Sequence, residues 1–353
     1  MSRQVSAPKG AVSIVVAVLM TVLIGFAALA VDIAYVFVIK NELQNAADAA
    51  ALAGSGALYN NEGGPDWDRA QEQALTTTRL NKVARESIKT AQIEVGYFSE
   101  SSSGSGGALL LDPDSIDDAA AVRVTIRKSD GNNSGPIRPF FAAIIGTDQV
   151  SIGATATGVV RIPSSANAGE LFPFIMSKCM YDNFWNSSAT PPQPKLDPIT
   201  NTPFIFTLSP AENPKKQGIS DPLCTEEGRG VWTTFQTSGG ASEVARYITE
   251  GNPDPLKIGD QIWVESGLQA TNYGRTRDCS AAGDSTCAKV SIAVVEDLYQ
   301  RTNAPIIAFA CLNILNAVQG QKTLTVQLTR GCTISGGGGG TDFGARTPPR
   351  LAQ

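Results

Sequence analysis

Residues 11–31 read AVSIVVAVLMTVLIGFAALAV and residues 32–53 read DIAYVFVIKNELQNAADAAALA, and these two stretches decide the fold. The first stretch has no charged residue. At about 1.5 Å per residue, a helix from Ala11 to Val31 crosses a hydrocarbon core of roughly 30 Å. The apolar part of a cleaved signal peptide is only about 7–15 residues long. We therefore predict a retained transmembrane helix over Ala11–Val31.

The second stretch continues this helix beyond the bilayer. It contains no Gly or Pro before Gly54 and is rich in Ala, the best helix former, so one helix over about residues 11–53 is expected. Asp32 opens this outer half, and small apolar residues then recur at three- and four-residue steps. The resulting packing seam comprises Asp32, Leu43, Ala46, Ala47 and Ala50. Two explanations stay open: docking onto the chain's own globular part, or packing against helices of neighbouring subunits.

The charges that flank the apolar stretch predict its orientation. Arg3 and Lys9 precede it, whereas Asp32 is the first charge after it. Because positive residues remain on the cytoplasmic side, we expect a short cytoplasmic N-terminus and an exported remainder.

The composition excludes most common catalytic designs. The chain has no His, which removes Ser-His-Asp and Cys-His nucleophile systems as well as His-ligated zinc and haem. The 28 Lys and Arg residues are spread thinly and the net charge is −5, so no nucleic acid partner is expected. We expect no enzyme, no cofactor and no metal site. Weak calcium binding by the acidic residues 112–118 and a two-carboxylate carbohydrate enzyme are lesser alternatives.

The length of 353 residues is enough for two domains, and the sequence pattern predicts an α+β chain in four parts. Residues 1–58 hold the cytoplasmic stub, the transmembrane helix and its extension. Residues 59–165 form a small α+β module, and residues 166–335 form a mostly β domain that contains all six Cys. Residues 336–353 are Gly- and Pro-rich, which favours a disordered tail.

Periodicity predicts the elements of the two folded parts. In the first, we expect a helix over 66–89, strands over 91–98, 121–127 and 150–162, and a short apolar helix or buried segment over 137–145. In the second, short strands between Gly-rich turns favour a β-sandwich or barrel. The strand candidates there are 204–208, 231–235, 261–264, 289–295, 306–315 and 323–328.

All six Cys lie in the part that the topology places outside, which favours disulfides over free thiols. Spacing ranks the pairings. Cys279 and Cys287 bracket a short polar loop, and Cys311 and Cys332 flank two successive strand candidates. The remaining pair would join Cys179 to Cys224 across a Pro-rich segment.

The N-terminal region resembles a known family. Lys9-Gly10, the apolar span, GFAALAVD over 25–32, Tyr35 and the string ELQNAADAAALAG over 42–54 occur in the order found in TadG-like proteins. These belong to the TadE/TadG-like group of Tad (Flp) pilus assembly proteins, and the resemblance extends to about residue 162. It implies a single-pass inner-membrane or pilin-like protein with a periplasmic head, whose partners are the bilayer and other pilus subunits bound through the N-terminal helix.

The same resemblance bears on stoichiometry. Gly10-Ala11 is similar to a prepilin cleavage site, but the fifth residue after it is Val15, where polymerising pilins carry Glu. We therefore expect a subunit of low abundance, either an uncleaved assembly factor or a tip-like minor pilin. The alternative is a membrane-anchored adhesin or ligand-binding protein outside any pilus.

Overall fold

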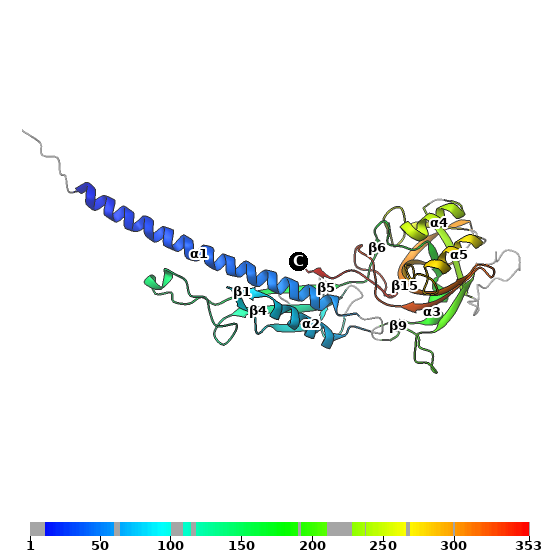
Figure 1. Ribbon diagram of the computed structural model, residues 1–353, viewed down its shortest axis with the longest axis horizontal. Helices are drawn as coiled ribbons and strands as arrows, with labels where there is room; N and C mark the ends of the chain where they lie inside the picture. The colour runs from blue at the N-terminus through cyan, green and yellow to red at the C-terminus, as the bar shows by residue number, and fades with distance from the viewer. Residues whose placement is uncertain are drawn as a thin grey trace, which may run out of the picture.

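The computed structural model describes residues 11–59, 64–99, 109–113, 118–189, 192–209, 228–236, 238–265, 269–298 and 301–352. The fold is α+β, as predicted. Helix α1 (Ala11–Gly56) is a single straight helix that projects far beyond the folded parts (Figure 1). It ends three residues after the predicted end, and it is long and apolar enough to cross a membrane.

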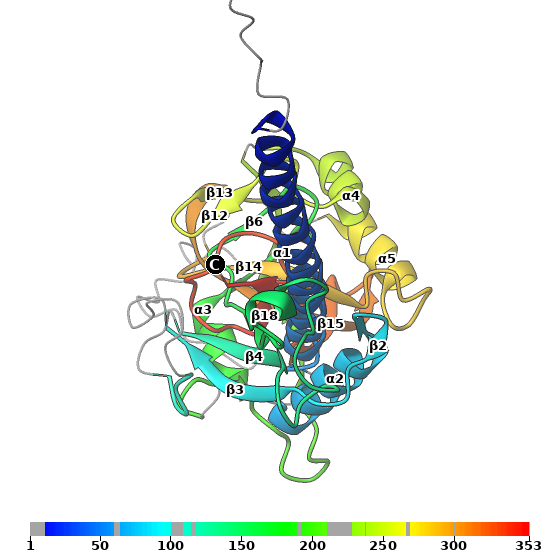
Figure 2. The ribbon, with the colours of Figure 1, turned by 90° about the vertical axis from the view of Figure 1, so that its left-hand side faces the viewer.

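The outer half of α1 belongs to a first module with a four-stranded antiparallel sheet. The sheet order is β19 (Arg350–Leu351), β5 (Ile152–Val160), β4 (Ala119–Lys128) and β3 (Gln92–Phe98). Helices α1 and α2 (Trp67–Leu80) pack together and cover one face of this sheet (Figure 2). Strands β3, β4 and β5 confirm the three predicted strands of this module.

The predicted helix over 66–89 is wrong in its second half. Helix α2 ends at Leu80, and strands β1 (Lys82–Val83) and β2 (Glu86–Ser87) form a hairpin. Ala84 and Arg85 occupy the left-handed region, with φ of 53° and 67°, which makes the tight turn. The carboxylate of Glu42 on α1 accepts a hydrogen bond from the Ala84 N–H (2.7 Å). This contact with α1 stabilises the hairpin in place of the helix that the apolar periodicity predicts.

The second module is built on a closed ring of six strands. These are β10 (Ile205–Ser209), β16 (Thr323–Thr329), β15 (Thr302–Val318), β14 (Lys289–Val295), β7 (Phe174–Ser177) and β11 (Gly228–Phe235). Each pairs with the next, and a short parallel pairing of β11 with β10 closes the ring. Strand β13 (Gln261–Val264) pairs with both β11 and β15. The barrel alternative of the prediction is therefore the observed one.

Both faces of the ring are packed. Along β14, Ile292 and Val294 enter one apolar cluster, whereas Ala293 and Val295 enter the other. This alternation follows the period of two of a strand. Three helices that the periodicity did not predict cover the ring: α3 (Lys178–Phe184), α4 (Ala241–Glu250) and α5 (Ala270–Cys279). Short pairs complete the module: β6 (Ser165–Ala166) with β12 (Leu256–Lys257), β8 (Trp185–Asn186) with β9 (Gln193–Pro194), and β17 (Cys332–Thr333) with β18 (Ala345–Arg346).

The Gly- and Pro-rich tail is ordered as far as residue 352, in contrast to the prediction. A Cβ atom on Gly336 would lie 1.8 Å from the Ser165 carbonyl oxygen, so this glycine run lies flush against the backbone of residues 162–165. Close approach, not flexibility, explains the glycines here. Beyond them the chain crosses back to the first module, where β19 pairs with β5 (Figure 1).

Two disulfides join the pairs that the spacing predicts. Cys279 bonds to Cys287, and Cys311 bonds to Cys332. Cys179 is also disulfide-bonded. Its predicted partner, Cys224, lies outside the described residues.

Candidate functional site at the membrane helix

The candidate site is helix α1 and the surfaces that hold it. Between Val12 and Val31 its large apolar side chains are exposed, with Ile14 67% and Phe26 67% accessible. An apolar surface of this extent is not stable in water, so it requires a bilayer or apolar partner helices. Gly10 of the predicted cleavage site lies outside the described residues, which begin at Ala11.

The packing seam lies on the face of α1 that docks onto the chain's own first module. Leu43, Ala46, Ala47 and Ala50 are at most 1% exposed and pack in the core with β4, β5 and α2. The small Ala side chains of this set permit a close approach. A Cβ atom on Gly158 of β5 would lie 2.4 Å from the Ala51 carbonyl oxygen of α1. Of the two explanations for the seam, the structure shows the intramolecular one.

Polar groups along one side of the seam fix the helix in register with the sheet. The Lys40 ammonium donates to the Gly153 carbonyl, and the Gln44 amide donates to the Thr155 carbonyl (3.2 Å). Both acceptors belong to β5, so α1 is held along this strand as well as against it. A rotation of α1 about its axis would break these bonds together with the apolar packing.

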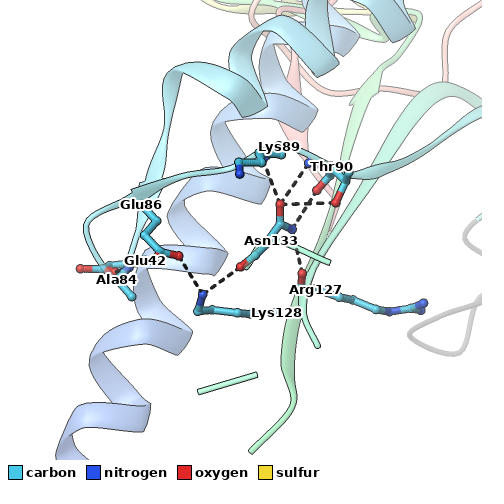
Figure 3. Close-up of polar contacts among 8 residues, drawn as sticks. All are labelled: Glu42, Ala84, Glu86, Lys89, Thr90, Arg127, Lys128 and Asn133. Carbon is cyan, nitrogen blue, oxygen red and sulfur yellow. Dashed lines mark hydrogen bonds and ion pairs between the residues drawn. The ribbon is translucent and has the colours of Figure 1, made fainter. Parts of the chain in front are cut away.

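A further polar cluster stabilises the β1–β2 hairpin, whose Ala84 N–H donates to Glu42. Asn133 lies between the β2–β3 connection and the end of β4 (Figure 3). Its side-chain oxygen accepts from the Lys89 and Thr90 N–H groups (2.9 and 3.0 Å), and its amide donates to the Arg127 carbonyl (2.7 Å). The neighbouring Lys128 pairs with Glu86 at 3.3 Å. Asn133 takes a φ of 47°, a conformation that Asn tolerates better than most residues.

Asp32 has a separate function at the end of the apolar span. It is 4% exposed, and its carboxylate accepts hydrogen bonds from the N–H groups of Phe140, Phe141 and Ala142 at 2.7, 2.9 and 2.6 Å. These residues open the short helix η1 (Ala142–Ile145), whose own preceding residue provides no side-chain cap. Asp32 therefore caps η1 from another part of the chain. The sequence identified Asp32 but gave no signal for this partner.

A cleft of about 390 Å³ lies where the two modules meet. Its lining includes Tyr59 from the segment after α1, Tyr181 and Trp185 from the second module, and Asp342 and Arg346 from the tail. The Arg346 guanidinium forms a bidentate pair with the Asp342 carboxylate (2.6 and 2.7 Å). Burial raises the pKa of the Tyr59 and Tyr181 phenols. The pattern analysis missed this constellation because the tail was expected to be disordered.

Among the described residues, no group of three His, Cys, Asp or Glu side chains is placed to hold a metal ion. The acidic cluster considered for calcium lies partly outside them. The site thus offers apolar surface, helix packing and buried polar anchors, and these are means of anchoring and assembly.

The long helix with its exposed apolar half and its docked outer half defines a membrane-anchored protein with a folded head. Residues 10–60 match the Flp pilus-assembly TadE/G-like family, and residues 53–157 match the Tad-like Flp pilus-assembly family. Residues 10–157 thus match models of the TadE/TadG-like group of Tad (Flp) pilus assembly proteins, as the resemblance predicted. No curated protein and no solved structure matches the chain.

Proposed function

We propose that this protein is a low-copy structural subunit of a Tad (Flp) pilus, with its head outside the cytoplasm. The family matches and the apolar helix support a membrane-anchored component of a Tad pilus. The burial of the packing seam is the observation that supports a low copy number. Because the chain's own head covers Leu43, Ala46, Ala47 and Ala50, this seam is not available to sibling subunits.

Two features support a low copy number. Val15 stands where polymerising pilins of this type carry Glu, so the N-terminal amine would lack its carboxylate partner in an apolar filament core. The head is also bulky, since two modules follow the helix. Both features disfavour repeated stacking but suit a subunit used once, at the tip or in the assembly base.

Quantitative mass spectrometry of sheared and purified pili tests this proposal. We expect the protein at far lower abundance than the small Flp pilin, with a mature N-terminus at Ala11 if it is a tip subunit and an intact N-terminus in the membrane fraction if it is an assembly factor. Abundance equal to that of the pilin would contradict the proposal. Absence from both pili and the assembly complex would favour a free-standing adhesin.

The orientation is tested separately. Thiol-labelling of a cysteine placed at Ile199, an exposed position of the second module, reports which side of the membrane holds the head. We expect labelling by an impermeant reagent from the outer side of the inner membrane, because Arg3 and Lys9 remain inside. Labelling only after the membrane is permeabilised would place the head in the cytoplasm.

A further inference from the structure

The loop over residues 137–150, here called the membrane-proximal loop, carries an apolar surface that the pilus function does not use. Its base is closed by reciprocal backbone hydrogen bonds between Ile137 and Val150 (2.9 Å each). Its tip holds η1 and exposes Phe140 (64%), Phe141 (42%) and Ile144 (83%). The sequence predicted a short apolar helix or a buried segment here, and the structure shows a short helix whose apolar side chains are exposed.

The loop is attached to α1 at the end of the apolar span. The Asp32 carboxylate accepts three hydrogen bonds from residues 140–142, and the Tyr35 ring contacts the Phe140 ring at a centroid distance of 5.0 Å. Figure 1 shows the loop leaving the sheet and reaching back along α1 toward its N-terminal half. The position of the tip is therefore set relative to the transmembrane segment.

Helix geometry fixes where this attachment lies in a bilayer. The uncharged span over Ala11–Val31 is about as long as a hydrocarbon core is thick, so Asp32 falls at its outer boundary. Asp32 is buried there, and the hydrogen bonds from three N–H groups offset the cost of removing its charge from water. The exposed side chains of Ile33 and Phe37 continue the apolar surface past this boundary.

We propose that the membrane-proximal loop is a second membrane contact, in which Phe140, Phe141 and Ile144 insert into the outer-facing leaflet beside α1. Arg138 is exposed at the base of the loop, where its guanidinium meets lipid phosphate groups. The occupant is lipid because the surface continues that of the transmembrane span. With contacts at both α1 and the loop, the head is held at a fixed angle to the membrane.

The test uses the full-length chain in nanodiscs that hold one copy each. An environment-sensitive fluorophore is attached to Ile144→Cys, and to Ile199→Cys as a control of similar exposure (91%) in the second module. The five described native cysteines are all disulfide-bonded, and the labelled parent protein supplies the background. Quenchers are lipids that carry a spin label on the acyl chain, and aqueous iodide.

We expect the acyl-chain quencher to act several-fold more strongly on the Ile144 label than on the Ile199 label, and iodide to show the reverse order. A label at Asp148→Cys, on the returning arm of the same loop, should be quenched mainly by iodide. Equal quenching at Ile144 and Ile199 would overturn the proposal. Shielding of Ile144 that appears only when two copies share a disc would also overturn it, because the occupant would then be a second chain. Neither result depends on the pilus.

Discussion

The guanidinium group of Arg346 lies over the ring of Tyr59, with its central carbon 4.7 Å from the ring centroid. Tyr59 lies three residues beyond the end of α1, whereas Arg346 belongs to β18 near the other end of the chain. Asp342 pairs with Arg346, and both side chains are nearly buried. The tail therefore connects the second module to the base of the membrane helix through a charge pair and a cation–π contact.

Loss of one partner of this buried pair should strongly destabilise the head. Arg346→Ala leaves the Asp342 carboxylate buried without its bidentate partner, which costs about 3–5 kcal/mol in comparable cases. The matched control is Arg277→Ala, whose partner Asp278 is largely exposed, and a change below about 1 kcal/mol is expected there. Urea unfolding of both variants measures the difference. Equal losses would mean that the buried pair does not secure the tail.

The close approach of α1 to β5 predicts an intolerant glycine. A Cβ atom at Gly158 would lie 2.4 Å from the Ala51 carbonyl oxygen and 2.5 Å from the Ser55 hydroxyl oxygen. Gly158→Ala should therefore displace α1 and cost about 1–3 kcal/mol. Gly320→Ala, where nothing lies within 4 Å of the added atom, is the control and should be near neutral. Thermal unfolding measures the loss of stability in each variant. Similar unfolding temperatures for the two would show that α1 shifts without cost to make room for the added methyl group.

Buried phenols predict a loss of stability at alkaline pH. Burial raises the pKa of Tyr97 to about 12 and also raises the pKa of Tyr59 and Tyr273. A group whose folded pKa is raised contributes stability that is fully present below its unfolded pKa, about 10 for Tyr, and lost as the pH rises through the folded value. Unfolding free energies should thus fall between about pH 10 and 12.

The control for this pH dependence is Tyr97→Phe, which cannot ionise at that position. Its stability should fall less steeply over the same pH range than that of the parent protein, as measured by urea unfolding at fixed steps of pH. Parallel curves for the two proteins would show that Tyr97 does not contribute.

Much of the first module was predictable because its signals are local. The length of α1 follows from an uninterrupted apolar and Ala-rich run, and β4 follows from strict alternation over residues 121–127. The bond partners of Asp32 and of Glu42 were not predictable, since they join segments that are distant in sequence. Gly336 shows a further limit: a glycine run has the same composition whether it is flexible or packed against another backbone.

In the second module, the pattern identified strands but not their helices. Helix α4 is only ten residues long and follows Gly240 without a side-chain cap, so it lacks a start signal. Strand β7 pairs with β11 and β14 inside the ring, but it has only three apolar residues before Ser177, a run too short for periodicity to classify. Tertiary packing, and not the local sequence, determines that these two segments form a helix and a strand. The pairing of Cys311 with Cys332 was predictable because Cys311 lies in one clear strand and Cys332 follows the next one.

The hydrogen bonds of Asp32 should determine how firmly the membrane-proximal loop is held on α1. Asp32→Ala leaves three N–H groups at residues 140–142 without their acceptor, although α1 itself keeps all its backbone hydrogen bonds. A hydrogen bond to a charged group contributes about 1.5–3 kcal/mol, and each 1.4 kcal/mol corresponds to a factor of about ten. The amides of Phe141 and Ala142 should therefore exchange with solvent about 10- to 100-fold faster in the variant.

The control is Asp48→Ala on the same helix, whose carboxylate accepts from the Gln44 amide and has no contact with the loop. Hydrogen exchange in detergent, read by mass spectrometry, separates the two. Unchanged exchange at 140–142 in Asp32→Ala, with global stability intact, would mean that apolar contact with Tyr35 holds the loop and that the carboxylate does not.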